Sequence, residues 1–330
     1  MKSSRCKRLT SSLIAFIILS MAEPFSADVY AATPEYPDRP ITLVVPYAVG
    51  GAVDLCARVL AEGMEKHLKQ PVVVVCKPGG GTTIGGNVIA TAKPDGYNIG
   101  FFAASSSIPE VFAYFYEAPY SSKDFKPISR VLAPVLAITV REDASWNSLK
   151  DLVDFTRKNP GVKVGTHGKS THGYVVMTTV AKAERINFVN VPFDGDSKIV
   201  PAILGGHIPV GTPAFPAIKS LIDAKKLKVL AFCIEKRTEF APEIPTVVEL
   251  GYKLAFISYL GLFAPKETPL EVIKKIDELV SRITEGQEFR TKIKNMGAQV
   301  SYEDTASFEK SLFQYKGNLQ TFFKEEGLVK

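Results

Sequence analysis

The chain has 330 residues, of which 46% are hydrophobic and 22% are charged. This is a globular composition, and the length exceeds that of one typical compact core, so we expect two domains. The 40 basic side chains outnumber the 34 acidic ones, and without residues 1–32 the numbers are 36 and 32. That excess is too small and too scattered for a nucleic-acid-binding protein, and the four cysteines and the Gly and Pro counts exclude a disulfide-dense or collagen-like chain.

Residues 1–32 have the pattern of a secretory signal peptide. Four basic residues precede an apolar run from Leu13 to Leu19, and small residues follow as far as Ala31-Ala32, where we expect cleavage. The run is only about a third of the length needed to span a bilayer, and no later segment reaches that length. We therefore expect an exported protein without stable membrane insertion, the alternative being a membrane anchor.

Export would remove Cys6 and leave three cysteines, Cys56, Cys76 and Cys233. Cys56 falls early in a predicted helix and Cys76 at the end of the next predicted strand, so a bridge between them is conceivable. Buried free thiols are the favoured interpretation, because buried cysteine behaves as a small hydrophobic residue.

The remaining chain alternates short apolar strands with helices. Strands are predicted at 41–45, 72–75, 97–102, 135–140, 162–165, 188–191 and 229–232. Helices are predicted at 55–68, 84–92, 149–158, 174–183 and 214–224, and the chain turns mostly helical from Pro269 onward. Strands that are apolar throughout are buried on both faces. The pattern predicts an α/β fold with mainly parallel central sheets and helices on both faces.

Two polar segments mark the predicted domain limits. Residues 141–147 are polar, and residues 239–245 are rich in Pro and Glu. Both fit a middle domain inserted into a first one. We predict a first lobe from residues 33–140 and 253–330, and a second lobe from residues 141–252.

Glycines gather where two predicted strands lead into helices, in Pro46-Tyr-Ala-Val-Gly-Gly-Ala52 and Pro78-Gly-Gly-Gly-Thr-Thr83. Glycine allows tight turns and close approach of the backbone to a ligand. The first NH groups of a helix lack intrahelical partners, and the helix dipole favours negative charge there. Together the two loops predict an anion-binding crevice, although either loop alone is also consistent with a plain turn.

A third segment, Gly165-Thr-His-Gly-Lys-Ser-Thr-His172, imitates the end of a phosphate-binding P-loop. Lys163 stands where that pattern needs its first glycine, so nucleotide chemistry is not predicted. The hydroxyls of Ser170 and Thr171 fit either helix caps or ligand donors. The two histidines are five residues apart with no carboxylate nearby in sequence, so no metal site is predicted.

No catalytic motif is present, and no cofactor is predicted. The sequence contains no Gly-x-Ser-x-Gly, Cys-x-x-Cys or Gly-x-Gly-x-x-Gly pattern. Asp194 and Asp196, on either side of Gly195, are interpreted as solvated loop carboxylates rather than as an acid/base pair. Ser105 and Ser106 fit either a polar wall of a binding site or a simple turn.

The chain resembles the substrate-binding proteins of tripartite tricarboxylate transporters, the Bug-type family. The matching segments follow one another in order over nearly the whole mature chain: Tyr36-Pro-Asp-Arg-Pro-Ile-Thr-Leu-Val-Val-Pro-Tyr-Ala-Val-Gly-Gly-Ala-Val-Asp54, Cys76-Lys-Pro-Gly-Gly-Gly81, Ile84-Gly85, Lys93-Pro-Asp-Gly-Tyr97, Val191-Pro-Phe-Asp-Gly195, Leu204-Gly-Gly206, Gly261-Leu-Phe-Ala-Pro265 and Thr268-Pro269. The resemblance implies a periplasmic binding protein-like fold whose two lobes close on a ligand, with hinges near Val140 and residues 249–257.

The resemblance also implies which residues bind. Backbone NH groups of the first two glycine loops would hold a carboxylate, at Tyr47, Ala48, Gly50, Gly51, Ala52, Gly80, Gly81 and Thr82. Ser105 and Ser106 join this set, and the second lobe would contribute Thr166, Ser170, Thr171, His172 and Asp194. His167 and Lys169 depart from the family, which carries small residues there. Cys76-Lys77 and Pro209 also depart, which puts in doubt the part of the site that selects the substrate.

The implied function is that of a receptor, not an enzyme. We expect a monomer that passes a small carboxylate unchanged to transporter membrane subunits and uses no metal, cofactor or nucleic acid. Two alternatives remain: a ligand-sensing module for a membrane kinase, and an enzyme on the same cleft with His172 or Asp194 as base.

Overall fold

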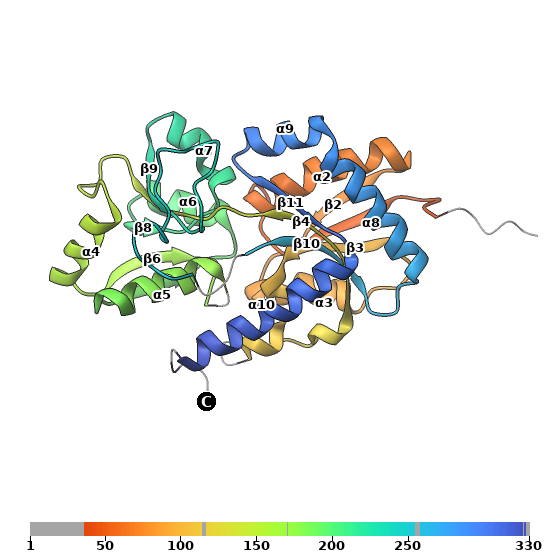
Figure 1. Cartoon of the computed structure of the whole chain (residues 1–330), viewed down its shortest axis with the longest axis horizontal. Helices are drawn as coiled ribbons and strands as arrows, with labels where there is room; N and C mark the ends of the chain where they lie inside the picture. The colour runs from red at the N-terminus through yellow and green to blue at the C-terminus, as the bar shows by residue number, and fades with distance from the viewer. Residues whose placement is uncertain (1–35, 114–116, 170, 255–257, 326, 328–330) are drawn as a thin grey trace, which may run out of the picture. The chain divides into compact units, whose positions relative to one another are not determined.

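The computed structural model describes residues 36–113, 117–169, 171–254, 258–325 and 327. The predicted signal peptide, Cys6 and Ser170 lie outside the described residues. Within residues 36–330, two β-sheets each collect their own covering helices (Figure 1). We call the six-stranded sheet with its helices the first lobe, and the five-stranded sheet with its helices the second lobe.

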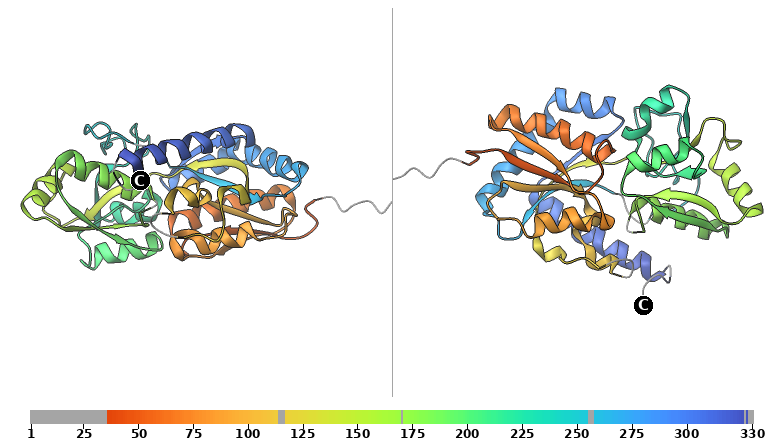
Figure 2. Two further views of the ribbon diagram at one scale, coloured as in Figure 1. Left: turned by 90° about the horizontal axis from the view of Figure 1, so that it is seen from below. Right: turned by 180° about the vertical axis from the view of Figure 1, so that it is seen from behind.

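The first sheet has the spatial order β11 (Gln299–Glu303), β4 (Phe125–Ala133), β10 (Leu260–Pro265), β3 (Asn98–Ala103), β1 (Ile41–Val45), β2 (Val72–Cys76). β1 pairs with β2 and β3 in parallel, whereas β10 and β11 pair antiparallel with their neighbours. The helices α2 (Ala52–Leu68), α8 (Leu270–Glu285) and α9 (Gln287–Asn295) lie on one face, with α3 (Thr83–Ala90) and α10 (Thr305–Glu325) on the other (Figures 1 and 2).

The second sheet has the order β7 (Phe188–Pro192), β6 (Val162–Thr166), β8 (Val210–Gly211), β5 (Ala137–Arg141), β9 (Leu227–Phe232). Side chains of α4 (Leu149–Lys158) and α5 (His172–Glu184) pack with Ile138 and Val140 of β5. Side chains of α6 (Asp196–Leu204) and α7 (Phe215–Asp223) pack instead with Ala137 and Phe232. Alternate residues of β5 thus serve two separate apolar cores, which places helices on both faces of the sheet.

The predicted α/β fold is confirmed, and parallel pairing holds for the strands β1–β3 and β6–β8. Antiparallel pairs arise where the chain passes between lobes, because β4 runs directly into β5 and the chain returns to the first sheet as β10. The sequence analysis did not predict β4, β10, β11 or α6. β4 mixes Pro127 and Arg130 with apolar residues, none of the β11 residues is buried, and α6 is short and contains Pro201.

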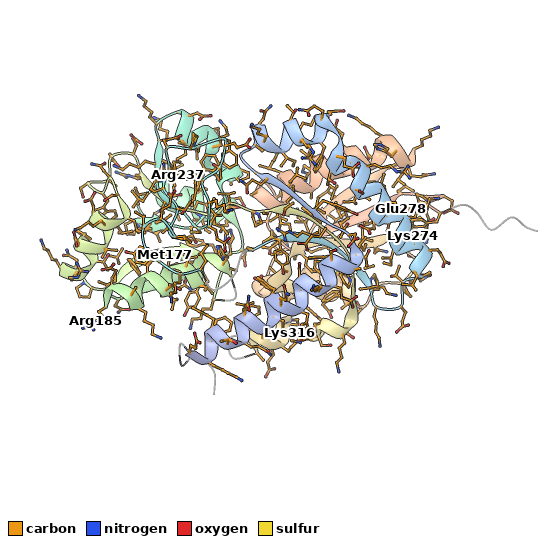
Figure 3. All side chains as sticks on the ribbon, in the orientation of Figure 1. Met177, Arg185, Arg237, Lys274, Glu278 and Lys316 are labelled. Atoms are coloured by element: carbon orange, nitrogen blue, oxygen red, sulfur yellow. The ribbon has the colours of Figure 1, made fainter. Side chains whose placement is uncertain are left out.

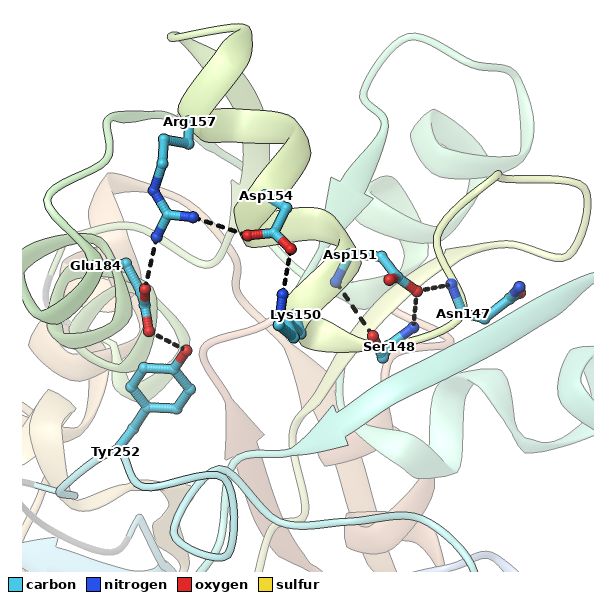
Figure 4. A network of polar contacts seen from close by, with 8 residues as sticks. All are labelled: Asn147, Ser148, Lys150, Asp151, Asp154, Arg157, Glu184 and Tyr252. Carbon is cyan, nitrogen blue, oxygen red and sulfur yellow. Dashed lines mark hydrogen bonds and ion pairs between the residues drawn. The ribbon is translucent and has the colours of Figure 1, made fainter.

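Polar contacts tie the surface elements of the second lobe together. Ser148 and Asp151 form a capping box at the start of α4, and Arg157 at the end of that helix donates to Glu184 of α5 (Figure 4). Tyr252 donates to the same Glu184 at 2.9 Å, so the end of α5 is bound both to α4 and to the segment that contains Tyr252. In the first lobe, α2 and α9 are joined by a network of surface ion pairs among Glu62, Lys66, Glu288 and Lys292. Lys274 and Glu278 pair one turn apart on α8 (Figure 3).

Cys56, Cys76 and Cys233 are free thiols, as the favoured interpretation had it. Cys56 and Cys233 are buried, and burial raises the pKa of both thiols to about 12. Among the helices that the structure describes, none is both long and apolar enough to cross a membrane.

Aromatic side chains dominate the core of the first lobe. Phe102 and Phe263 stack with ring centroids 4.4 Å apart, and Phe125 meets both edge-on. The ring of Phe308 from α10 lies directly over the Gly261 backbone, where a Cβ atom would come within 2.3 Å of it. The strand β10 therefore carries both Phe263, which contacts the other two rings, and Gly261, which lets α10 approach.

We predict that Phe263→Ala lowers the free energy of unfolding by about 3–5 kcal/mol, because it empties a fully packed site. Phe313→Ala is the matched control, since Phe313 is 79% exposed on α10. Its cost should stay within about 0.5 kcal/mol. Urea unfolding of both variants measures the difference, and equal losses would contradict the assignment of Phe263 to the core.

Candidate functional site

In the first glycine loop, between β1 and α2, the two glycine NH groups have acceptors in the loop and the first turn of α2. The Gly50 NH donates to the Asp54 carboxylate at 2.9 Å, and the Gly51 NH to the Ala48 carbonyl at 3.3 Å. Asp54 also accepts the guanidinium of Arg58 at 2.9 Å. Two of the NH groups predicted to bind a ligand are therefore used inside the loop.

A third NH of this loop, that of Ala52, donates to the other lobe. Its acceptor is the Asp196 carboxylate, with 3.0 Å between Ala52 N and Asp196 Oδ2. The second oxygen, Oδ1, accepts from Ala214 N at 2.9 Å and lies 2.8 Å from His167 Nε2. Asp196 is 3% exposed, so the prediction that it is a solvated loop carboxylate is wrong.

The Asp196 carboxylate lies where three helices begin. Ala52 is the first residue of α2, Ala214 caps α7, and Asp196 itself opens α6. Burial acts to raise the pKa of Asp196, but His167 and the NH groups of Ala52 and Ala214 outweigh it, and the pKa lies below its usual value. The positive ends of helix dipoles add to this stabilisation, so we treat Asp196 as ionised.

The second glycine loop, between β2 and α3, is arranged differently. Gly79, Gly80, Gly81 and Thr82 all have positive φ, and Thr82 N closes a turn by donating to the Gly79 carbonyl at 3.1 Å. Within the part of the chain that the structure describes, the NH groups of Gly80 and Gly81 make no hydrogen bond. These are donors that a ligand can use.

Ser106 connects the two glycine loops by hydrogen bonds. Its hydroxyl accepts from Thr82 Oγ1 at 2.9 Å and lies 3.3 Å from the hydroxyl of Tyr47. Ser106 is 3% exposed, and Tyr120 donates to its carbonyl. The side chain of Ser106 thus links Thr82 of the second loop to Tyr47 of the first.

Two cavities lie between the loops of the first and second lobes. The smaller, about 60 Å³, is lined by Tyr47, Gly51, Val53, Ala103, Ser105, Pro134, Leu136, His167, Thr171, His172, Gly195, Asp196, Ala214, Ser258 and Leu260. The larger, about 420 Å³, is lined by Pro46, Tyr47, Gly79, Gly81, Thr82, His167, Gly168, Pro192, Phe193, Asp194 and Lys198. Small-molecule sites usually measure about 300–1,000 Å³, so only the larger of these two cavities has room for a metabolite in this arrangement.

Sequence comparison identifies the chain's relatives. The family model described as tripartite tricarboxylate transporter family receptor matches residues 56–325. The chain belongs to this family. Protein BugT of Bordetella pertussis is 30% identical over 272 residues, which is 81% of each chain.

Solved structures agree with this family assignment. The periplasmic binding protein BugD is 30% identical and superimposes with a TM-score of 0.81. The match covers 88% of this chain and 99% of BugD. MatC from Rhodopseudomonas palustris, solved with bound malate, has the same fold at 23% identity and a TM-score of 0.79, over 87% of this chain and 99% of MatC. Known folds of this tripartite tricarboxylate transporter receptor family therefore consist of two lobes, as here.

The structure brings most of the predicted site residues to the two cavities. Tyr47, Gly51, Gly81, Thr82, Ser105, Thr171, His172 and Asp194 line one or both. Ala48, Gly50, Ala52, Gly80 and Ser106 are adjacent to these walls without lining them, and Ser170 is outside the described residues. Thr166 is buried, and its hydroxyl donates to Asn190 on the neighbouring strand, so it faces a different cavity.

Several cavity residues were not predicted from the sequence, among them Asp196, Lys198 and Ser258. Asp196 and Lys198 lie in the first turn of α6, a helix that the sequence analysis missed. The apolar residues Ile199, Val200 and Ile203 have helical spacing and could have revealed it. Among the described residues there is no group of three or more His, Cys, Asp or Glu side chains suited to a metal.

His172 lies in the wall of the smaller cavity as a neutral imidazole. Burial lowers its pKa to about 4, although its Nε2 lies 2.7 Å from the Cys233 carbonyl, which partly opposes the shift. A histidine neutral in the folded state and protonated when unfolded destabilises the protein in acid. The contribution is complete above about pH 6.5 and is lost as the pH falls towards 4.

We predict that His172→Gln flattens the fall in stability between pH 7 and pH 4.5. The wild-type loss attributable to His172 should be about 2–2.5 kcal/mol, because it accumulates between about pH 6.5 and pH 4.5 at no more than about 1.4 kcal/mol per pH unit. Glutamine can still donate to the Cys233 carbonyl but does not titrate. Urea unfolding at both pH values tests this, and equal acid losses in the two proteins would refute it.

Proposed function

We propose that this chain is a periplasmic receptor that holds a small carboxylate between its lobes and delivers it unchanged to a tripartite tricarboxylate-type membrane transporter. The observation that carries the proposal is the 420 Å³ cavity walled by the second glycine loop. The family description, and the malate bound by MatC, support a carboxylate as ligand.

The second loop supplies the anion site in this proposal. The Gly81 NH is unused within the described residues and belongs to the cavity wall, and the Gly80 NH is next to it. Lys198, from the first turn of α6, lines the same cavity from the opposite lobe. A carboxylate between them would receive backbone NH groups from one lobe and an ammonium group from the other.

The strength of such contacts is sufficient for a transport receptor. Hydrogen bonds to a charged group contribute about 1.5–3 kcal/mol each. Three of them, in a cavity that excludes water, reach micromolar affinity after the cost of association. The first loop has a different role, because its Gly50, Gly51 and Ala52 NH groups already have acceptors.

We predict that Gly81→Ala weakens carboxylate binding at least about tenfold. Gly81 has φ +61°, and a Cβ there costs about 1–2 kcal/mol, so the loop must rearrange and turn its NH groups away. Calorimetry with mono-, di- and tricarboxylates of two to six carbons measures the change.

Gly161→Ala is the matched control, because Gly161 also has positive φ, with only an ordinary contact at 3.9 Å from its missing Cβ, and lines neither cavity. It should cost similar strain and leave affinity unchanged. If ligand-free wild-type protein bound no member of the panel, the proposed function would be wrong.

Delivery to a transporter has its own test in the native host. Deleting the gene should abolish uptake of the carboxylate that calorimetry identifies. The wild-type gene should restore this uptake, whereas the Gly81→Ala variant should restore it only at higher substrate concentration. Unchanged uptake together with a lost transcriptional response to the same acid would instead favour the kinase-sensing alternative.

A further inference from the structure

The Asp196 carboxylate occupies an anion position between the lobes. It accepts the first NH of α2 from one lobe and the cap NH of α7 from the other, and His167 contacts it as well. These are the kinds of donor that a ligand carboxylate would use at a helix N-terminus. The chain thus places one of its own carboxylates on the first loop and leaves the second loop open.

The two cavities meet at shared residues. Tyr47 and His167 belong to the walls of both, so the 420 Å³ cavity adjoins the smaller one, which Asp196 lines. The smaller cavity, at about 60 Å³, adds little room beside Asp196. A ligand bound on the second loop therefore extends its other end towards the side of the cleft where Asp196 and His167 lie.

Asp and Glu side chains outnumber Lys and Arg side chains among the described residues that line these two cavities. Among the described residues that line either cavity, Lys198 is the only Lys or Arg, while Asp194 and Asp196 are both acidic. Asp196 is already partnered by His167 at 2.8 Å. One ligand carboxylate can pair with Lys198 and the second loop, but a second carboxylate would find no cation and two carboxylates of the protein.

We infer that Asp196 takes the place of a second ligand carboxylate and makes this receptor selective for acids with a single carboxylate whose far end is neutral or donates hydrogen bonds. This rests on the proposed carboxylate-binding function and specifies its substrate class. Selectivity arises by repulsion of the wrong ligand, because like charges brought together in a water-poor site disfavour binding.

The test compares dicarboxylates with their half-amides, which have nearly the same shape and one charge fewer. Calorimetry at pH 7.5 would use succinate against succinamate and adipate against adipamate, with the wild-type chain and Asp196→Asn. We expect the wild type to bind one half-amide at least about tenfold more tightly than its dicarboxylate, and Asp196→Asn to shift that ratio at least about tenfold towards the dicarboxylate.

The control is Asp151→Asn, which removes a carboxylate that also caps a helix of the second lobe but lies outside both cavities (Figure 4). It should leave the ratio unchanged, and thermal unfolding shows whether each variant is folded. A wild-type preference for dicarboxylates, an unchanged ratio in Asp196→Asn, or loss of all binding in the folded variant would overturn the inference. Absence of binding of every acid to both proteins would overturn the proposed function as well.

Discussion

A buried carboxylate at the meeting point of three helix N-termini organises the space between the lobes. Asp196 is 3% exposed and ionised, and a buried charge is tolerated only where donors surround it. The donors come from α2 in one lobe and from α7 and His167 in the other. The backbones must approach closely for this, and a Cβ on Gly195 would lie 3.3 Å from Ala48. Glycine at this position is thus a consequence of the contact between lobes.

The contact between Asp196 and Ala52 also distinguishes the two glycine loops, which are similar in sequence. Both follow a strand, contain consecutive glycines and open a helix. In the first loop the NH groups of Gly50, Gly51 and Ala52 have acceptors, whereas in the second those of Gly80 and Gly81 have none within the described residues. A glycine-rich turn at a helix start therefore indicates available donors only when no carboxylate of the protein reaches them. Which loop is open depends on acids that lie outside the loop motif itself.

Local patterns in the sequence were enough for much of the fold. Apolar runs and helical spacing predicted β1, α2, β2 and α4 to within a few residues, because β1 is almost wholly buried and each of the two helices buries an apolar stripe. β2 was recognised from its run of valines, although it lies at the sheet edge and Val73 is 49% exposed. β4 and β11 were not predicted because strands at a sheet edge or between lobes carry polar residues. α6 was not predicted because Pro201 and the short length of the helix obscure the helical spacing of its apolar residues. The burial of Asp196 could not be predicted, since its partner Ala52 is 144 residues away and the sequence gives no sign of that proximity.

This pairing also gives His167 a partner that the sequence did not reveal. The resemblance had led us to expect a small residue at position 167. In the structure the His167 Nε2 lies 2.8 Å from the Asp196 carboxylate, on the oxygen that does not contact α2. A carboxylate at position 196 without His167 would have a poorly compensated oxygen in a buried site, and a large imidazole at position 167 without Asp196 would fill the cleft with no acceptor. The two residues are therefore best understood as one unit, and the character of the cleft on the second-lobe side follows from that pair rather than from the glycine loops that the family shares.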